Sequence, residues 1–312
     1  MQFSPELIQK NVPLKSLVTF KLGGPAEYFY TADNSESLRA AVEWARQQKM
    51  PLFILGGGSN LVVSDAGLEG LVIHNRCMKV NSVDAEKHQI DISSGYDFEY
   101  LVELAQRHGL AGTESFAGIP GSIGGAIYGN AGAYGRCIAD VLIDARVLCP
   151  DGSIQTVDNS FFGFDYRTSR LKTDPHIILS ARFQLEAGNA DEIKAKMDDI
   201  VAQRHSKHPP YEIGCAGSFF KNLPPLPGED RRRAAGAVLE QAGAKKMSCG
   251  GASVFEKHAN FIINTGNATA SDVKNLAAML KDKVKKEFGI ELCEEVLYVG
   301  RWPSAQAATH NR

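Results

Sequence analysis

Hydrophobic positions in the first third of the chain alternate between helical and strand spacing. Leu38, Ala41, Val42 and Ala45 recur at i, i+3, i+4 and i+7, which places them on one face of a helix predicted over residues 35–49. Short apolar runs separated by glycines follow this helix and predict strands. These runs lie at 51–55, 61–63 and 70–75. The pattern indicates alternating helices and strands.

The middle of the chain indicates mostly β-structure after one more helix. Helical spacing returns over residues 96–109, with Gly109 as the expected stop. Two apolar runs within 141–157 then flank Pro150-Asp151-Gly152, a turn sequence that predicts a hairpin. A further strand is expected over 176–185.

The last third begins with a change of composition at residues 186–192, where a long helix starts and runs to about Ser206. We therefore expect one domain over 1–188, with subdomains of about 1–75 and 76–188, and a second over 189–300. Helices are predicted at 231–243 and 268–289, and a closing strand over 290–300. The tail, 301–312, is expected to be disordered.

Composition narrows the functional class. The chain has 312 residues, long enough for about two domains, and a formal net charge of −2. That balance gives no reason to expect a nucleic acid or a membrane as partner. The six cysteines include no C-x-x-C pair, and no apolar run reaches the roughly 18 residues of a membrane span. We expect a cytoplasmic, monomeric protein that acts on a small molecule.

Two glycine-rich segments suggest ligand binding. Residues 55–60 (LGGGSN) lie between two apolar runs, so a strand, a loop and a strand are expected. The small residues can present several backbone N–H groups beside Ser59 and Asn60, which suits a phosphate, although simple turn formation remains an alternative. The segment matches neither a P-loop nor the dinucleotide-binding fingerprint.

The second segment spans residues 117–135 and contains seven glycines, spaced three or four residues apart over most of it. Such density requires close approach of the backbone to something along most of the segment. Tight packing between helix and strand is one explanation. We favour the other, in which the backbone faces a ligand.

Seven blocks of the chain resemble those of the UDP-N-acetylenolpyruvoylglucosamine reductase family and follow one another in the same order as in that family. Members of this family make UDP-N-acetylmuramate for bacterial peptidoglycan. Besides the two glycine segments, the matching blocks are 12–29, 164–172 (FDYRTSRLK), 216–222 (AGSFFKN), 256–264 (EKHANFIIN) and 291–300 (ELCEEVLYVG). The resemblance covers about residues 10–300. No extra tyrosine-bearing loop fits between Arg167 and Ser218, so the chain resembles the shorter type of the family.

The resemblance implies an α+β protein, with an FAD-binding fold of the vanillyl-alcohol-oxidase (PCMH) type and a C-terminal α+β substrate domain. FAD would be bound without a covalent bond, and NADPH would supply the hydride. The implied cofactor-binding residues are Gly56, Gly57, Gly58, Ser59, Asn60, Gly118, Pro120, Gly121, Ser122, Gly124 and Gly125.

The resemblance also assigns catalytic roles. Ser218 would protonate the carbanion or enolate that hydride addition creates, a task for which a hydroxyl must be well positioned. Arg167 would pair with the substrate carboxylate, and Glu295 would donate a hydrogen bond to it as a protonated acid. Glu294 is the alternative for that last role. Neighbouring residues on a strand point to opposite faces, so only one of the two glutamates can face the site.

Four further residues are implied to hold the substrate, and two other functions stay open. The substrate residues are Tyr166, Lys207, Lys221 and Asn222. One of the other functions is that of a flavin-dependent oxidase of the same fold on another substrate, against which Ser218, Lys221 and Asn222 in family spacing argue. The other is that of a non-catalytic flavin- or nucleotide-sugar-binding protein, against which the three catalytic residues argue. His205 and His208 lack a third ligand at suitable spacing, so no metal site is expected.

Overall fold

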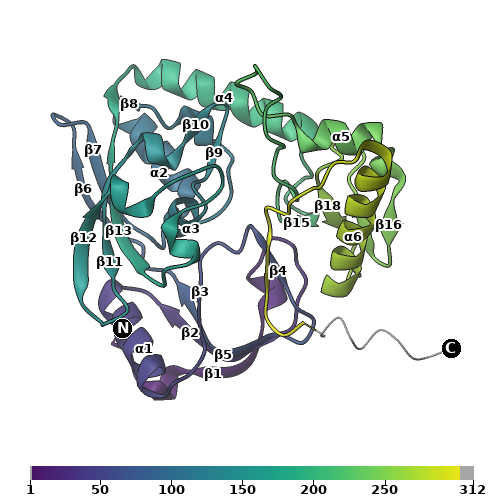
Figure 1. Ribbon diagram of the computed structural model, residues 1–312. Helices are drawn as coiled ribbons and strands as arrows, with labels where there is room; N and C mark the ends of the chain where they lie inside the picture. Colours follow the sequence, from purple (N-terminus) through teal and green to yellow (C-terminus); the bar gives the residue numbers. More distant parts are fainter. Residues whose placement is uncertain (1, 303–312) are drawn as a thin grey trace. The chain divides into compact units, whose positions relative to one another are not determined.

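The computed structural model describes residues 2–302, and the chain divides into two compact units (Figure 1). Unit 1 comprises the residues up to Gln9, Phe29–Gly57 and Leu71–Lys207. Unit 2 comprises Lys10–Tyr28, Gly58–Gly70 and the described residues from His208 onward. Two early segments of the chain therefore belong to the same unit as its last third.

Unit 1 contains a five-stranded antiparallel sheet in the order β12-β11-β13-β7-β6. Its strands are β6 (Val80–Asp84), β7 (Gln89–Ser93), β11 (Leu142–Leu148), β12 (Ile154–Asp158) and β13 (Ile177–Gln184). The predicted hairpin and the strand over 176–185 are confirmed, because β11 pairs with β12 across the Pro150-Asp151-Gly152 turn. Ile92, Val147 and Phe183 are fully buried in the core of this unit.

Two helices of unit 1 follow the predicted pattern, and a third, short one lies within the second glycine segment, where no helix was predicted. Leu38, Ala41, Val42 and Ala45 are buried on α1 (Ser35–Gln47), which Asn34 caps by accepting a hydrogen bond from Ser37 N–H. α2 spans Phe98–Arg107, and the short α3 spans Ile123–Tyr128. All three helices bury apolar residues, and those of α2 and α3 join the core that includes Phe183.

The long helix α4 (Ala190–Lys207) belongs to unit 1, which differs from the boundary expected at 188/189. Ile193 and Met197 of α4 are buried in the same core as Phe116 and Leu185, so the two units part after the helix. The change of composition marked where this helix begins. It did not reveal where the buried face of the helix packs.

A second sheet has four strands in the order β1-β2-β5-β3. These are β1 (Gln9–Pro13), β2 (Pro25–Ala32), β3 (Leu52–Leu55) and β5 (Leu68–Asn75). Strands β3 and β5 are parallel, and the first sheet begins after β5, at Val80. The subdomain boundary expected near residue 75 stays a prediction.

Unit 2 is built on a four-stranded antiparallel sheet with α6 (Ala270–Phe288) against it. Its strands are β15 (Gly214–Cys215), β16 (Ser248–Cys249), β17 (Ala252–Val254) and β18 (Ile262–Asn264). Both expected ends of α6 are confirmed: Thr269 and Asp272 form a capping box, and Gly289 ends the helix in left-handed conformation.

The early segment 58–70 contributes two connections inside unit 2. Strand β4 (Leu61–Val63) pairs in parallel with β19 (Leu297–Val299). The Asp65 carboxylate accepts hydrogen bonds from the N–H groups of Ala270 and Ser271, at 2.8 and 3.0 Å. A carboxylate at this position stabilises the first turn of α6 by satisfying N–H groups that lack a partner within the helix.

Two predicted elements are shorter than expected. Helix α5 spans Ala235–Gln241 rather than starting at residue 231, because Arg233 pairs with Leu223 in extended conformation. The closing strand is confined to β19, since Glu294 makes only an isolated bridge to Phe220. Of the tail, expected to be disordered, residues 303–312 lie outside the described residues.

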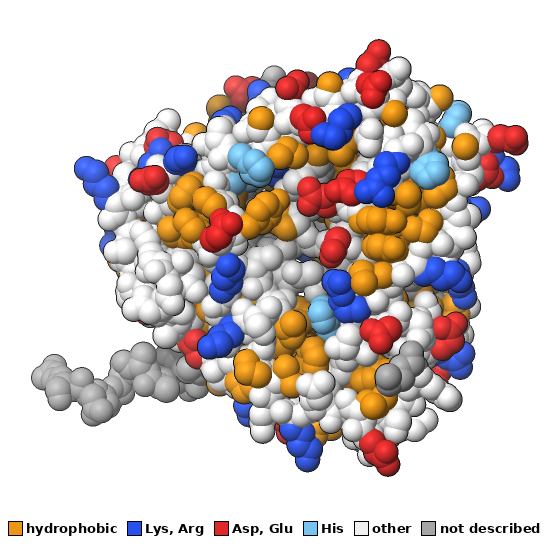
Figure 2. Space-filling view, turned by 180° about the vertical axis from the view of Figure 1, so that it is seen from behind, with side chains coloured by type: hydrophobic (Ala, Val, Ile, Leu, Met, Phe, Trp, Pro, Cys, Tyr) orange, Lys and Arg blue, Asp and Glu red, His pale blue; other side chains and the backbone are white. Residues whose placement is uncertain are grey.

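The remaining short strands all lie in unit 1. They are β8 (Leu110–Ala111), β9 (Gly132–Ala133), β10 (Arg136–Cys137) and β14 (Glu186–Ala187). Among the described residues, no helix combines the length and apolar composition that a membrane span requires. In the face shown in Figure 2, basic and acidic side chains are interspersed.

Candidate active site

The two glycine segments meet in unit 1 through their backbones. A Cβ atom on Gly57 would lie only 2.7 Å from the Cα atom of Gly121, and a Cβ atom on Gly56 would collide with the Ser122 hydroxyl. The backbone of Gly121 excludes a side chain at position 57, and one at position 56 would require Ser122 to move. The loop 56–60 joins β3 to β4, so the expected order of strand, loop and strand is confirmed.

The loop also presents unpaired backbone donors. The N–H groups of Gly57 and Gly58 donate no hydrogen bond to any other residue that the structure describes. Gly58 has a φ of +61°, a left-handed conformation that turns successive N–H groups toward a common side. These residues therefore fit the pyrophosphate of a dinucleotide such as FAD, which accepts hydrogen bonds and leaves little room for side chains.

Close packing explains several glycines of the second segment. A Cβ on Gly124 would lie 3.2 Å from that of Ser94, and one on Gly132 would lie 2.8 Å from that of Cys137. Gly118 has a φ of +70° and lies beside Arg204 of α4. Packing thus accounts for part of the glycine density. That the same backbone faces the flavin stays a prediction.

Arg167 occupies a turn with unusual backbone geometry in unit 1. Its φ is +56°, in the left-handed region that residues with a side chain rarely adopt. Its guanidinium donates to the carbonyl oxygens of Gly132, at 2.6 Å, and Asn130, at 3.4 Å, both in the second glycine segment. The guanidinium carbon also lies 5.5 Å from the centre of the Tyr166 ring. Three predicted elements of the site are thereby brought together: the glycine segment, Tyr166 and Arg167.

Ser218 lies in unit 2 on a turn held by a buried asparagine. Gly217, just before it, has a φ of +73°. The Asn260 side chain accepts from Phe220 N–H at 2.9 Å and donates to Phe220 C=O at 2.8 Å. Phe219 N–H donates to Asn260 C=O at 2.8 Å. Asn260 was missed as a supporting residue, although an amide inside the otherwise apolar run NFII was a visible signal.

Glu295 is attached to the same turn. Its N–H donates to Phe219 C=O at 2.8 Å, and its own carbonyl accepts from the Asn60 side chain at 3.2 Å. The Glu294 carboxylate instead accepts from Lys281 of α6, at 3.0 and 3.1 Å. The Glu294 side chain therefore faces α6. That the Glu295 side chain faces the site stays a prediction.

The remaining predicted residues are distributed over both units. Lys221 follows the serine turn, and its N–H donates to Cys293 C=O at 2.9 Å. The Asn222 side chain accepts from Ala235 N–H at 3.2 Å, so it caps α5. Lys207 is exposed at the end of α4 in unit 1. Within the described part of the chain, no group of three or more His, Cys, Asp or Glu residues could hold a metal ion.

A cysteine near the serine turn is not an alternative nucleophile at neutral pH. Cys215 lies three residues before Ser218, and burial raises the pKa of its thiol. The thiol therefore stays protonated and unreactive across the physiological range.

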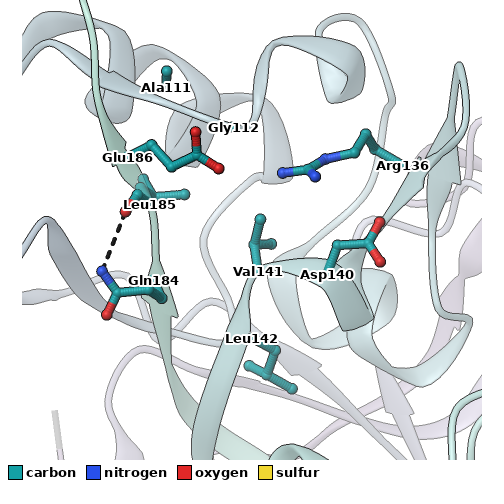
Figure 3. Close-up of a pocket in the computed structure, with 9 residues that line it drawn as sticks. All are labelled: Ala111, Gly112, Arg136, Asp140, Val141, Leu142, Gln184, Leu185 and Glu186. Carbon is teal, nitrogen blue, oxygen red and sulfur yellow. Dashed lines mark hydrogen bonds between the residues drawn. The ribbon is translucent and has the colours of Figure 1, made fainter.

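A separate pocket lies on unit 1 beside β8, β10 and β14 (Figure 3). Arg136, Asp140 and Glu186 line it, together with apolar residues, and none of the predicted site residues does. Its volume of about 160 Å³ is below the roughly 300–1,000 Å³ of usual ligand pockets. It does not fit a dinucleotide.

The glycine-lined loop suits an anionic cofactor, and the comparisons with known proteins place the chain in the class of FAD-dependent oxidoreductases. The family model for the FAD binding domain matches residues 26–158, and that for the UDP-N-acetylenolpyruvoylglucosamine reductase C-terminal domain matches residues 209–299. The chain belongs to the UDP-N-acetylenolpyruvoylglucosamine reductase family.

Individual members of the family are similar to this chain over nearly its whole length. The reductase of Acaryochloris marina is 41% identical, covering 95% of this chain and 94% of the relative. That of Synechococcus sp. is 40% identical over 96% of this chain and 97% of the relative. The crystal structure of the Thermus caldophilus reductase superposes with a TM-score of 0.77 at 31% identity, covering 95% of this chain and all of the other. The predicted family, fold class and enzyme class are confirmed.

Proposed function

We propose that the chain reduces the enolpyruvyl ether of UDP-N-acetylglucosamine enolpyruvate to UDP-N-acetylmuramate, with Arg167, Ser218 and Glu295 acting at the reacting group. The family assignment supports this reaction and the use of FAD and NADPH. The observation that carries the residue roles is the serine turn. Its backbone is fixed by buried Asn260 and is hydrogen-bonded to Glu295.

When bound by the two glycine segments, FAD would supply hydride-transfer chemistry between NADPH and the β-carbon of the enolpyruvyl group. The electron pair of the double bond then lies on the α-carbon and its carboxylate, and a proton is needed there to complete the product. Ser218 supplies that proton from its hydroxyl. A serine is a weak acid, so it acts only because the enolate of a carboxylate is strongly basic and the hydroxyl is fixed in position.

Arg167 and Glu295 stabilise the carboxylate while it carries the extra negative charge. A guanidinium can bind both carboxylate oxygens at once. Glu295 would donate from a protonated carboxyl group. We assign this role to Glu295 rather than Glu294, because Glu294 is bound by Lys281. Both interactions grow stronger as negative charge develops, which is the requirement for accelerating the step.

The cofactor would be held chiefly by the backbone of the two glycine segments. The N–H groups of Gly57 and Gly58 would bind the pyrophosphate, with Ser59 and Asn60 beside them. For the UDP-sugar, Lys221 supplies a charge suited to phosphate, and Tyr166 and Lys207 are further candidates. Asn222 would bind through its amide nitrogen, since its oxygen accepts from Ala235 N–H.

The setting of the reaction is also part of the proposal. The chain would act as a monomer in the cytoplasm, on a small molecule, without nucleic acid or membrane partners. The near-neutral net charge of −2 gives no reason to expect a nucleic acid or an anionic membrane as a partner. Sedimentation of the FAD-loaded protein would give the mass of one chain, and a dimer would contradict the monomer.

Absorbance of the flavin separates the two half-reactions and tests the proposal. Under anaerobic conditions NADPH should bleach the flavin band of the purified protein, and the substrate should restore it. In Ser218→Ala, bleaching by NADPH should remain, whereas restoration by substrate should slow about 100- to 10,000-fold, the range of general acid catalysis. Ser206→Ala, at an exposed position, is the control.

Other outcomes favour the alternatives. Restoration by oxygen alone would point to an oxidase, and absence of flavin binding would point away from the two glycine segments. Restoration by substrate at the full rate in Ser218→Ala would show that another group supplies the proton.

A further inference from the structure

The backbone of Arg167 adopts a conformation that its side chain disfavours. A φ of +56° brings Cβ close to the following carbonyl, and such residues persist only where the surrounding structure holds them. Glycine would relieve this crowding, yet arginine occupies the position. The turn therefore needs support from neighbouring groups.

Lys172 provides the first support. Its ammonium donates to the carbonyl oxygen of Arg167 at 2.7 Å, a charge-assisted hydrogen bond to the very residue with the unusual φ. The ammonium also lies 5.9 Å from the centre of the Tyr128 ring. Burial raises the pKa of Tyr128, so that ring stays a neutral phenol beside the cation.

Asn130 provides the second support, from the glycine segment. Its side chain donates to Asp165 C=O at 3.0 Å and accepts from Ala139 N–H at 3.2 Å. Its own carbonyl oxygen accepts from the Arg167 guanidinium. Asn130 is 5% exposed and also has a positive φ, of +44°. Both the backbone and the guanidinium of the Arg167 turn are thereby anchored on the same residue.

We infer that Lys172 and Asn130 are positioning residues that hold Arg167 in its left-handed conformation, so that its guanidinium is aimed before the substrate arrives. This inference rests on the proposed role of Arg167 at the substrate carboxylate. Lys172 and Asn130 act through Arg167 and contact no reacting atom in this scheme. Loss of either support lets the backbone relax and moves the guanidinium, and a displacement of about 1 Å can cost about 100-fold in rate.

A double-mutant cycle tests the inference. In the FAD-loaded full chain, Lys172→Met should slow restoration of the flavin band by substrate about 10- to 100-fold, with bleaching by NADPH unchanged. In an Arg167→Ala background, Lys172→Met should change that rate less than about twofold, because the group it positions is gone. Lys172→Arg, which keeps a charged donor, should recover most of the rate.

The control removes a charge from the same short helix η6 (Arg170–Lys172) without loosening the turn. Arg170 is exposed and lies against the Phe161 ring, so Arg170→Met should leave the rate unchanged. If Lys172→Met does not fold, Asn130→Asp carries the same test, since it keeps the acceptor oxygen and loses the donor to Asp165.

The outcomes separate this inference from the proposed function. Equal slowing by Lys172→Met in both backgrounds, or no slowing at all, would overturn the positioning role while leaving that of Arg167 intact. An unchanged rate in Arg167→Ala alone would instead overturn the proposed carboxylate contact, and the positioning role with it.

Discussion

The turns that carry Arg167 and Ser218 solve the same backbone problem in opposite ways. Each includes a residue with left-handed φ, +56° at Arg167 and +73° at Gly217. At the serine turn a glycine takes this conformation, and Ser218 itself follows it. At the arginine turn the proposed catalytic residue takes the conformation and bears its steric penalty of roughly 1–2 kcal/mol.

The difference teaches that the position of the left-handed residue decides what kind of support a site needs. The serine turn is fixed by neutral hydrogen bonds among nearly buried residues, with Asn260 2% exposed and Phe220 1% exposed. The arginine turn also has a buried amide, Asn130, but it depends in addition on the ammonium group of Lys172, which is only partly buried. Changes in the serine turn should therefore mainly lower the free energy of unfolding. Changes in the arginine turn should mainly lower the rate of the reaction.

Removing the buried asparagine should have the largest effect on stability. Asn260→Ala leaves both the N–H and the C=O of Phe220 without their partner, and each unsatisfied buried group costs about 1–3 kcal/mol. We expect the free energy of unfolding to fall by about 2–5 kcal/mol in denaturant titrations. Asn81→Ala, which removes an exposed hydrogen bond to Asp91, should change it by less than about 0.5 kcal/mol. Equal changes would contradict the contrast between the turns.

Adding a methyl group at Gly217 should have an intermediate effect. No heavy atom lies within 4 Å of a Cβ there, so Gly217→Ala tests the backbone conformation alone. The expected loss is about 1–2 kcal/mol of stability, with slower restoration of the flavin band because Ser218 is displaced. Gly266→Ala, in equally open space at a φ of +119°, should destabilise without slowing the reaction. If Gly217→Ala reacts at the full rate, the position of Ser218 does not depend on the backbone conformation of Gly217.

Neutralising Glu294 should have the smallest effect. Its ion pair with Lys281 is partly exposed, and such pairs contribute about 0–1 kcal/mol. Glu294→Gln should therefore lower stability by less than about 1 kcal/mol and leave the rate within about twofold. Glu295→Gln should slow reoxidation of the flavin by substrate far more. The reverse result would exchange the roles of the two carboxylates.

Local elements were predictable from the sequence where local chemistry decides them. Helix α6 has its capping residues Thr269 and Gly289 in sequence, and α1 has its apolar residues at helical spacing. The start of α5 was not predictable, because the RRR sequence is compatible with a helix but Arg233 pairs with Leu223 instead. Pairing partners distant in sequence also decide the extent of the closing strand.

The residues of the candidate site were predictable from the sequence, but the hydrogen bonds and backbone conformations that hold them in position were not. Family blocks indicated Arg167, Ser218 and Glu295, whereas the unusual φ of Arg167 leaves no signal in the sequence. Asn260 was visible as an amide in an apolar run, yet its bonds to Phe220 depend on the fold. The packing of Gly57 against Gly121 shows the same limit, since two segments far apart in sequence share one steric constraint.

The arrangement of unit 2 bears on how this protein can be divided at the level of the gene. Its last third depends on β4 for the partner of β19 and on Asp65 for the first turn of α6. A gene fragment that begins at residue 208 encodes neither. The C-terminal portion is therefore unsuited to recombination as a contiguous cassette, and a transferable version would have to splice residues 10–28 and 58–70 back onto it.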